Sequence, residues 1–376
     1  MKDNILYVVS TLKRTGPTNQ LFNLIRHLDL ERFEPHVLTL SPEPMDSRWL
    51  DYELLGVRVR SLSLSRMAGV FWGRKYLGKT IEEVQPALIH TQGIRADILS
   101  ASIDSGVPRV STIRNFPQYD YAMTYGGLQS KIMLWRHIQA MRNLDLCIGV
   151  SQAVSTNLTQ ELEVQNVDVV SNGVDVEKYF PVTDLEKKNL RDKLGLQCGS
   201  EFWVSSGHLT ERKNPLLIIS AWKKIFGRDT TKQLIFLGDG DLKIECEKAS
   251  LGCDNIHIVG RVENVPDYLK ASDYFISASR AEGLPNAVLE ALACGLPVLL
   301  SDIEPHREIW ERDPKIGFMF DPDSQENLQD VFLNILQTDR GSQSRAALSL
   351  VEGVFSAKAM STNYQDIYLK FISGAA

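Results

Sequence analysis

The sequence has no long hydrophobic run. Its N-terminal stretch "MKDNILYVVSTLKR" holds a five-residue apolar segment, Ile5 to Val9, which is shorter than the about 7–15 residues of a secretory signal. Nowhere do about 18 apolar residues follow one another, as a membrane-spanning helix requires. The sequence therefore predicts a cytoplasmic protein that is at most peripheral to the inner face of a membrane.

Cysteine is scarce and unpatterned. The five cysteines, at positions 147, 198, 246, 253 and 294, form no C-x-x-C pair and no metal-binding spacing. This excludes a disulfide framework and a structural zinc site, and favours reduced thiols. The sequence also has no cluster of His and Cys residues, so we expect no bound metal and no cofactor.

A strong positive charge is missing as well. Charged residues make up 23% of the chain and the net charge is −6, which argues against a nucleic-acid binder and against disorder. The charge is uneven, however: residues 1–171 hold 18 basic and 17 acidic residues, whereas the remainder holds 23 and 30. The front half is therefore the part that could bind to an acidic surface without strong electrostatic repulsion.

Two segments of the front half contain no acidic residue. Residues 61–81 and 126–142 each combine Lys and Arg with aromatic and aliphatic side chains. Such segments suit an anionic bilayer surface, and they equally suit an ordinary amphipathic helix packed on a sheet. We expect peripheral membrane attachment because one domain carries two of them. The residues concerned are Arg66, Phe71, Trp72, Arg74, Lys75, Tyr76, Lys79, Lys131, Ile132, Met133, Leu134, Trp135, Arg136, Ile138 and Arg142.

Short apolar runs alternate with longer amphipathic stretches along the whole chain. This alternation predicts parallel sheets with crossover helices. The expected strands are 5–10, 35–40, 57–62, 87–91, 109–113, 146–151 and 167–171, then 202–207, 233–238, 256–260, 274–279 and 297–301. A polar, turn-forming segment at 172–189 separates the two series.

The pattern therefore predicts an α/β protein of two doubly wound, Rossmann-like domains facing across a cleft. We expect an N-terminal domain over 1–171, a linker over 172–184 and a C-terminal domain over 185–355. The final segment, 356–376, contains a predicted helix with no strand after it.

Three loops at predicted strand ends of the second half attract attention. In "GHLTERKNP", Arg212 and Lys213 precede a helix that opens at Pro215, which indicates either a diphosphate site or two solvated cations. "FLGDGDL" has a G-x-G pair without the third glycine of a dinucleotide loop, which favours a tight turn. After 256–260, Arg261 and Val262 either meet a nucleobase or form a plain turn.

The stretch "SRAEGLPNAVLEALACGLPV" places two carboxylates in apolar surroundings. Glu282 falls in the loop after a buried strand, and Glu290 falls in the helix that begins near Asn286. The simplest interpretation takes Glu282 as a partner of the helix dipole and Glu290 as an exposed helix position. A carboxylate in so apolar a helix needs hydrogen-bond partners, however, and sugar hydroxyls are good ones.

These motifs, in this order along nearly the whole chain, resemble glycosyltransferase family four, a family of retaining enzymes with the GT-B fold. "GVSQAVSTNL", "SNGVDVEKYFP", "GHLTERKNP" and "GRVENVPDYLKASDYFISASRAEGLPNAVLEALACGLPVLLSD" carry the resemblance. It implies a catalytic role for Glu282 and Lys213, and a final helix that returns to the first domain. The donor-binding residues that it implies are Gly16, His208, Arg212, Lys213, Arg261, Val262, Glu282, Gly283, Leu284, Pro285, Asn286 and Glu290.

The sequence departs from the family pattern at several positions. The family usually has Arg at the position of His208 and a second glycine at that of Pro17. Gln92, Arg114 and Asn115 stand where histidines near the reacting sugar are common, and we place these three on the acceptor side. His90 is more simply interpreted as a hydrogen-bonded strand-end residue than as a catalytic one.

The resemblance implies a retaining transfer of a hexosyl or N-acetylhexosaminyl group from a nucleotide-diphosphate sugar, preferably a UDP-sugar. The expected acceptor is a lipid-linked saccharide in the synthesis of lipopolysaccharide, O-antigen or capsule. Two alternatives remain open at this point: a sugar-nucleotide epimerase of the same architecture, and a non-catalytic partner subunit that keeps the fold.

Overall fold

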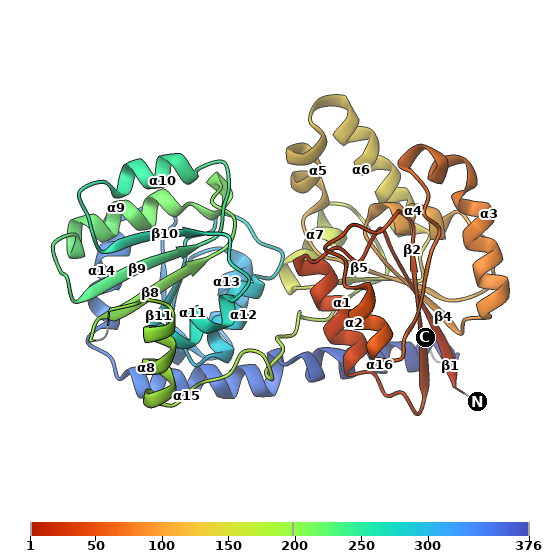
Figure 1. Ribbon diagram of the computed structural model, residues 1–376. Helices are drawn as coiled ribbons and strands as arrows, with labels where there is room; N and C mark the ends of the chain where they lie inside the picture. Colours follow the sequence, from red (N-terminus) through yellow and green to blue (C-terminus); the bar gives the residue numbers. More distant parts are fainter. Residues whose placement is uncertain (1, 198, 375–376) are drawn as a thin grey trace. The chain divides into compact units, whose positions relative to one another are not determined.

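The chain folds into two α/β units, which Figure 1 shows as a computed structural model. The structure describes residues 2–197 and 199–374, so Cys198 lies outside the described residues. One unit runs to Gly173 and takes in the segment from Ala357 onward, and the other spans Val174–Ser356. Each unit is described by itself below.

The first unit is built on a seven-stranded parallel sheet in the order β3-β2-β1-β4-β5-β6-β7. Its strands are β1 (Asp3–Val9), β2 (Phe33–Thr39), β3 (Arg58–Ser61), β4 (Leu88–Gln92), β5 (Arg109–Ile113), β6 (Leu146–Gly149) and β7 (Val167–Val169). Its helices are α1 (Gly16–Arg26), α2 (Trp49–Leu54), α3 (Arg66–Val84), α4 (Ile94–Ala101), α5 (Pro117–Tyr125), α6 (Gly127–Arg142), α7 (Gln152–Gln160) and α16 (Ala357–Ile372).

Both faces of this sheet are covered, and β1 shows why. Ile5, Tyr7 and Val9 belong to the apolar cluster formed with α1, α2 and α16, while Leu6 and Val8 belong to the cluster formed with α3 and α4. Successive side chains of a strand point to opposite faces. A strand that is apolar at every position is therefore what a sheet with helices on both sides requires.

The last helix, α16, belongs to the first unit although the chain reaches it from the second. Its Ser361 hydroxyl donates to the carbonyl of Leu24 at 2.8 Å, and Tyr364 and Tyr368 are buried against the sheet. The Tyr368 hydroxyl lies 2.6 Å from Nδ1 of His90, and Thr112 lies 2.8 Å from its Nε2. His90 is therefore a fully hydrogen-bonded core residue, and burial lowers its pKa to about 3.

The second unit has a six-stranded parallel sheet in the order β10-β9-β8-β11-β12-β13. Its strands are β8 (Glu201–Ser206), β9 (Lys232–Leu237), β10 (Ile256–Gly260), β11 (Tyr274–Ser277), β12 (Val298–Ser301) and β13 (Gly317–Phe320). Its α-helices are α8 (Asp184–Lys193), α9 (Pro215–Phe226), α10 (Lys243–Ser250), α11 (Val265–Ala271), α12 (Asn286–Ala293), α13 (Glu304–Trp310), α14 (Gln325–Ile335) and α15 (Arg340–Leu350). Short helical turns are η1 (Glu211–Lys213), η2 (Pro314–Ile316) and η3 (Val351–Phe355).

The core of the second unit is aromatic. Trp203 of β8 stacks on Tyr274 of β11 with ring centroids 4.3 Å apart, Trp222 and Phe332 meet it edge-on, and the ring of Phe226 lies tilted against it. Strand β13 was not among the predicted strands. Its four residues, "GFMF", follow a proline-containing turn and give too short an apolar run to be distinguished from a loop.

A buried carboxylate joins α8 to the sheet of the second unit. Asp273 accepts hydrogen bonds from Lys187 at 2.7 Å, Arg191 at 2.6 Å and Arg340 at 2.8 Å, and from the backbone N–H of Phe202. Burial opposes the charge of Asp273, but these partners outweigh burial and lower its pKa. The polar segment that follows the predicted linker is thereby fixed to the second sheet.

In the part of the chain that the structure describes, no helix combines the length and hydrophobicity that crossing a bilayer requires.

Candidate active site

Three of the predicted site residues, Arg212, Lys213 and Glu282, form a charged cluster at the carboxyl ends of the second unit's strands. After β8 the chain passes through Gly207 and the turn η1, which presents Arg212 and Lys213, and then enters α9 at Pro215. Asn214 is the N-cap residue of this helix, but its side chain donates to the carbonyl of Pro322 and does not cap the backbone N–H groups. Its left-handed backbone, with φ of 51°, is a conformation that Asn tolerates.

The glycines of "FLGDGDL" serve packing, as the tight-turn interpretation predicted. A Cβ atom on Gly238, whose φ is 146°, would lie 1.9 Å from the carbonyl oxygen of Gly207. A Cβ atom on Gly240 would lie 2.4 Å from the carbonyl oxygen of Leu209. The backbone of the loop after β9 therefore packs directly against the backbone of the loop after β8. Any side chain at Gly238 or Gly240 would prevent this contact.

Glu282 lies at the centre of the cluster. Its Oε1 accepts hydrogen bonds from Lys213 Nζ at 2.5 Å and from the Ser279 hydroxyl at 2.7 Å, and its Oε2 accepts one from Arg212 Nη1 at 3.1 Å. A carboxylate has about four acceptor positions, so one position on Oε2 remains for a ligand hydroxyl. Glu282 itself is only 8% exposed.

The charges of this cluster keep Glu282 ionised. Burial alone raises the pKa of the Glu282 carboxyl, but Lys213, Arg212 and the hydrogen bonds from Lys213 and Ser279 outweigh it, so the pKa lies below its ordinary value. The Lys213 ammonium uses one of its three N–H donors on Glu282, and the side chain makes no other hydrogen bond within the described residues. Two donors of Lys213 are thus available to an anionic ligand.

The second carboxylate of the motif lies on α12, which begins at Asn286 and ends before Gly295, as predicted. Glu290 is half-buried and hydrogen-bonded to Tyr179, which comes from the segment directly after the first unit. Burial raises the pKa of Glu290 to about 7, although Lys178, Tyr179 and Lys213 act in the opposite direction. Unlike Glu282, Glu290 is therefore close to half-ionised at neutral pH.

The other predicted donor-side residues of this unit lie along the same sheet edge. His208 is exposed and lines a small pocket with Lys213, Phe236, Ser277 and Ser279. The three residues between Glu282 and α12, which are Gly283, Leu284 and Pro285, are buried. Arg261 and Val262 follow the edge strand β10, and Arg261 is exposed and makes no hydrogen bond or ion pair within the described residues.

Three residues of the cluster were not predicted. Ser279 was missed although a hydroxyl three residues before Glu282, at the end of a strand, is a usable signal. Tyr179 was treated only as part of the linker. His306 lies fully buried behind the cluster, with Nδ1 2.9 Å from the carbonyl oxygen of Ser301, and burial lowers its pKa to about 4. His306 lies on α13, 24 residues after Glu282 in the sequence, so no local sequence pattern reveals that it lies close to the Glu282 loop.

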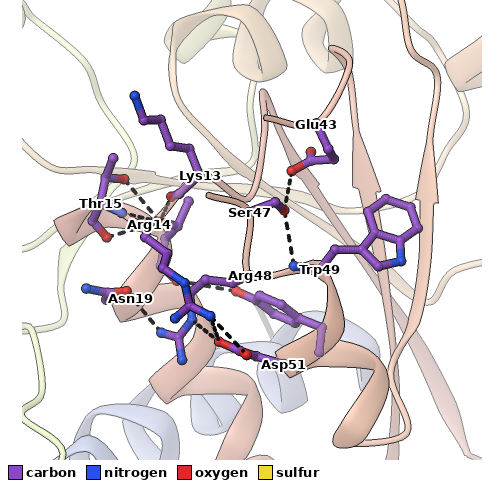
Figure 2. Close-up of polar contacts among 11 residues, drawn as sticks. Lys13, Arg14, Thr15, Asn19, Glu43, Ser47, Arg48, Trp49 and Asp51 are labelled. Carbon is purple, nitrogen blue, oxygen red and sulfur yellow. Dashed lines mark hydrogen bonds and ion pairs between the residues drawn. The ribbon is translucent and has the colours of Figure 1, made fainter. Parts of the chain in front are cut away.

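In the first unit, the loop that contains the predicted Gly16 is held by its neighbour. Figure 2 shows the loop after β1 beside the loop after β2: Arg14 N–H donates to the Asp46 carbonyl at 3.0 Å, and Arg48 N–H to the Leu12 carbonyl at 2.8 Å. Asp51 binds the side chains of both Arg14 and Arg48. These two arginines are therefore committed to the loop's own structure.

Gly16 is the first residue of α1, after the N-cap Thr15 and before Pro17. The Thr18 side chain closes the turn through bonds to Thr15. Lys13 is 55% exposed and only 4.0 Å from its nearest carboxylate, Asp46.

Two of the three acceptor-side predictions are neighbours. The Arg114 guanidinium donates from Nη2 to Gln92 Oε1 at 2.9 Å and from Nη1 to Asn172 Oδ1 at 3.2 Å. Gln92 ends β4 and Arg114 directly follows β5, so both lie at the carboxyl edge of the first sheet. Asn115 is exposed, and within the described residues its side chain forms no hydrogen bond with Gln92 or Arg114.

Two family models match the chain on either side of its unit boundary. "Glycosyltransferase Family 4" matches residues 14–178, and "Glycosyl transferases group 1" matches residues 186–349. The chain belongs to the group 1 glycosyltransferases of family 4.

Curated relatives of this glycosyltransferase include two from Escherichia coli. "UDP-Gal:alpha-D-GlcNAc-diphosphoundecaprenol alpha-1,3-galactosyltransferase" is 30% identical over 60% of each chain. "O-antigen biosynthesis glycosyltransferase WclY" is 24% identical over 97% of each. The galactosyltransferase match thus spans less than two thirds of that protein's length.

Solved structures agree on the fold. Sucrose-phosphate synthase from Thermosynechococcus elongatus has a TM-score of 0.82 at 16% identity, over 99% of this chain and 100% of that one. HepE from Anabaena, solved with UDP-glucose, has a TM-score of 0.79 at 18% identity, over 97% and 98%. The predicted GT-B class, with two Rossmann-like sheets, is confirmed.

Proposed function

We propose that this glycosyltransferase moves a sugar from a UDP-sugar to a lipid-linked saccharide, with retention of the anomeric configuration, in surface-polysaccharide synthesis. The observation that carries the proposal is the buried Glu282 with one free acceptor position, beside Lys213 with two free donors. The Glu282 carboxylate suits a sugar hydroxyl and the Lys213 ammonium suits a diphosphate oxygen. Lys213 Nζ and Glu282 Oε1 lie 2.5 Å apart.

The donor is assigned to the second unit on the chemistry of its loops. Lys213 and Arg212 lie directly before α9, where backbone N–H groups favour anions. Glu282 accepts hydrogen bonds from the sugar hydroxyls, with the backbone of Gly283 to Asn286 beside it, and Glu290 accepts them from the ribose. Arg261 and Val262 flank the base. A UDP-sugar is favoured because HepE is solved with UDP-glucose and the galactosyltransferase relative uses UDP-Gal.

The transfer step needs the diphosphate to leave with its electron pair. Negative charge then develops on the departing oxygen, and Lys213 and Arg212 stabilise it from fixed positions without a metal ion. The acceptor hydroxyl attacks from the face that the diphosphate leaves, and its proton passes to a phosphate oxygen. This path retains the anomeric configuration, and the ionised Glu282 stabilises the positively charged sugar centre.

The acceptor is assigned by the relatives' names. The galactosyltransferase acts on a diphosphoundecaprenol-linked sugar and WclY belongs to O-antigen synthesis. A lipid-linked acceptor also suits the exposed face of α3, which carries Met67, Val70, Phe71, Trp72 and Tyr76 at 43–74% exposure.

Transfer from UDP-sugars to short-chain lipid-diphosphate saccharides, followed by mass spectrometry, tests the assignment. Glu282→Gln keeps the size of the side chain but removes the charge, so we expect at least a hundredfold loss of transfer. Glu304→Gln, which alters an exposed carboxylate of α13, is the matched control. Full transfer by Glu282→Gln would refute the site.

We further propose that α3 and α6 attach the first unit to an anionic membrane surface. The apolar residues of α3 named above are exposed beside Arg66, Arg74 and Lys75, and α6 exposes Leu128, Ile132 and Trp135. Such a mixture binds bilayers by apolar burial and by attraction to anionic lipids.

Flotation with liposomes that contain anionic lipid tests this attachment. The wild-type chain should float at low salt, and a Phe71→Ser/Trp72→Ser variant should float much less. Leu54→Ser removes an equally exposed apolar side chain from α2 and should float as the wild type does. Absence of wild-type flotation at low salt would remove the idea.

A further inference from the structure

Arg114 carries a positive charge for which the described residues provide no counter-ion. Its two hydrogen-bond acceptors, Gln92 Oε1 and Asn172 Oδ1, are neutral amide oxygens, and it forms no ion pair with a carboxylate among the residues described. By contrast, Arg191 in the second unit is bound to Asp273 at 2.6 Å. Arg114 is partly buried, so its charge is partly removed from water without the compensation that Arg191 receives.

The hydrogen-bonding capacity of Arg114 is mostly unused. A guanidinium has five N–H donors, and Arg114 donates two bonds, one from each terminal nitrogen. Its Nε is buried and has no partner in the structure. Buried donors without partners are rare in folded proteins, because each has lost its hydrogen bond to water without gaining another.

Gln92 provides a second, independent sign of a missing ligand. The side chain is 8% exposed, and its Nε2 is buried without a partner while its Oε1 accepts from Arg114. The amide orientation is fixed by that bond, because the guanidinium can only donate. Gln92 and Arg114, which are hydrogen-bonded to each other, therefore each carry an N–H group without a partner among the described residues.

The position of this pair in the sheet is one where ligands bind. Gln92 pairs in register with Thr112, two residues before Arg114, so both side chains come from the carboxyl ends of the central strands β4 and β5. In open α/β sheets ligands bind beyond these ends. A planar fork of donors with a positive charge matches the oxygens of a phosphate group in particular.

We propose that Arg114 and Gln92 form a phosphate site in the first unit, which binds a phosphate group of the acceptor. The assignment to the acceptor rests on the proposed function, since the donor diphosphate is assigned there to Lys213 and Arg212. The site itself rests only on Arg114 and Gln92. Arg14 and Arg48 do not compete for this role, because both guanidinium groups are already paired with the carboxylate of Asp51.

Calorimetric titration of inorganic pyrophosphate into the full chain saturated with UDP tests the proposal. UDP occupies the donor site, so the pyrophosphate that still binds reports a separate site. Arg114→Met should weaken this binding at least tenfold, because a charge-assisted hydrogen bond is lost. Gln92→Leu should weaken it about threefold, as expected for a neutral donor.

Arg58→Met is the matched control, since Arg58 is 71% exposed and paired with Glu34 at 3.0 Å in the same unit. It should bind pyrophosphate as the wild type does. Equal binding by Arg114→Met, or an equal loss in Arg58→Met, would overturn the proposal. A lower melting temperature of Arg114→Met with unchanged pyrophosphate affinity would assign Arg114 a purely structural role and would also overturn it.

If Arg114→Met does not fold, Arg114→Lys takes its place. Lysine retains the charge but lacks the planar guanidinium, so we expect Arg114→Lys to lose more pyrophosphate affinity than Gln92→Leu and less than Arg114→Met. UDP binding measured alone separates the two proposals. Loss of UDP binding on Lys213→Met, with pyrophosphate binding intact, supports both sites. A wild-type chain that binds no UDP contradicts the donor assignment, and the Arg114→Met and Arg58→Met variants are then compared by pyrophosphate titration without UDP.

Discussion

The ionisation of Glu290 predicts that donor binding depends on pH. In the free protein its pKa is about 7, so about one tenth of the molecules have an ionised Glu290 at pH 6 and about nine tenths at pH 8. Ribose hydroxyls donate hydrogen bonds and therefore favour the carboxylate over the neutral acid. We expect UDP-glucose to bind roughly tenfold more tightly at pH 8 than at pH 6, with release of a proton.

Calorimetry of UDP-glucose binding in buffers of different ionisation enthalpy measures both quantities. UDP-glucose is the better probe, because its diphosphate diester does not titrate in this range as the terminal phosphate of UDP does. Glu290→Gln should bind more weakly and with no pH dependence between 6 and 8. Glu304→Gln should behave as the wild type does. A wild-type affinity that does not change with pH, or a Glu290→Gln variant that keeps the change, would refute the reasoning.

The same pKa has a consequence for stability, whose sign is opposite to that of a salt-bridged acid. The unfolded carboxyl releases its proton near 4.5 and the folded one near 7. Between these values the folded chain binds more protons, so stability falls as pH rises through this window. Glu290→Gln should therefore be less affected by a change from pH 5 to pH 8 than the wild type, as measured by urea unfolding.

Three further perturbations test other parts of the structure. Asp273→Asn weakens the charge pairing with three cations of the second unit, so we expect a loss of about 3 kcal/mol in unfolding free energy; an unchanged urea midpoint at pH 7 would contradict this. Gly238→Ala places a methyl group against the Gly207 carbonyl, and a loss of about 2 kcal/mol or more, seen as a lower melting temperature, is expected. Chelation with EDTA should leave the transfer rate unchanged, because Lys213 stabilises the leaving group in place of a metal; a loss restored by added Mg²⁺ would show otherwise.

Much of the fold could be predicted from the pattern of apolar residues. All seven strands predicted for the front half and all five predicted for the second half are present, because buried parallel strands are apolar at nearly every position. Strand β13 could not be predicted, since it owes its place to pairing with β12 and has no distinctive pattern of its own. The fate of the last helix was implied by the resemblance alone, because its contacts with α1 join residues more than 300 positions apart.

The candidate site divides in the same way. The sequence by itself determined which residues carry charge beside helix starts and glycine loops, so Lys213, Arg212 and Glu282 were identified without coordinates. Only the tertiary structure decided what surrounds them. It gave Glu282 and Glu290 opposite pKa shifts, because two cations bound to Glu282 outweigh its burial, whereas burial dominates at Glu290. Among the residues that the structure describes, it also left Arg114 without a counter-ion, a property that depends on every strand end around it and on no local stretch of sequence.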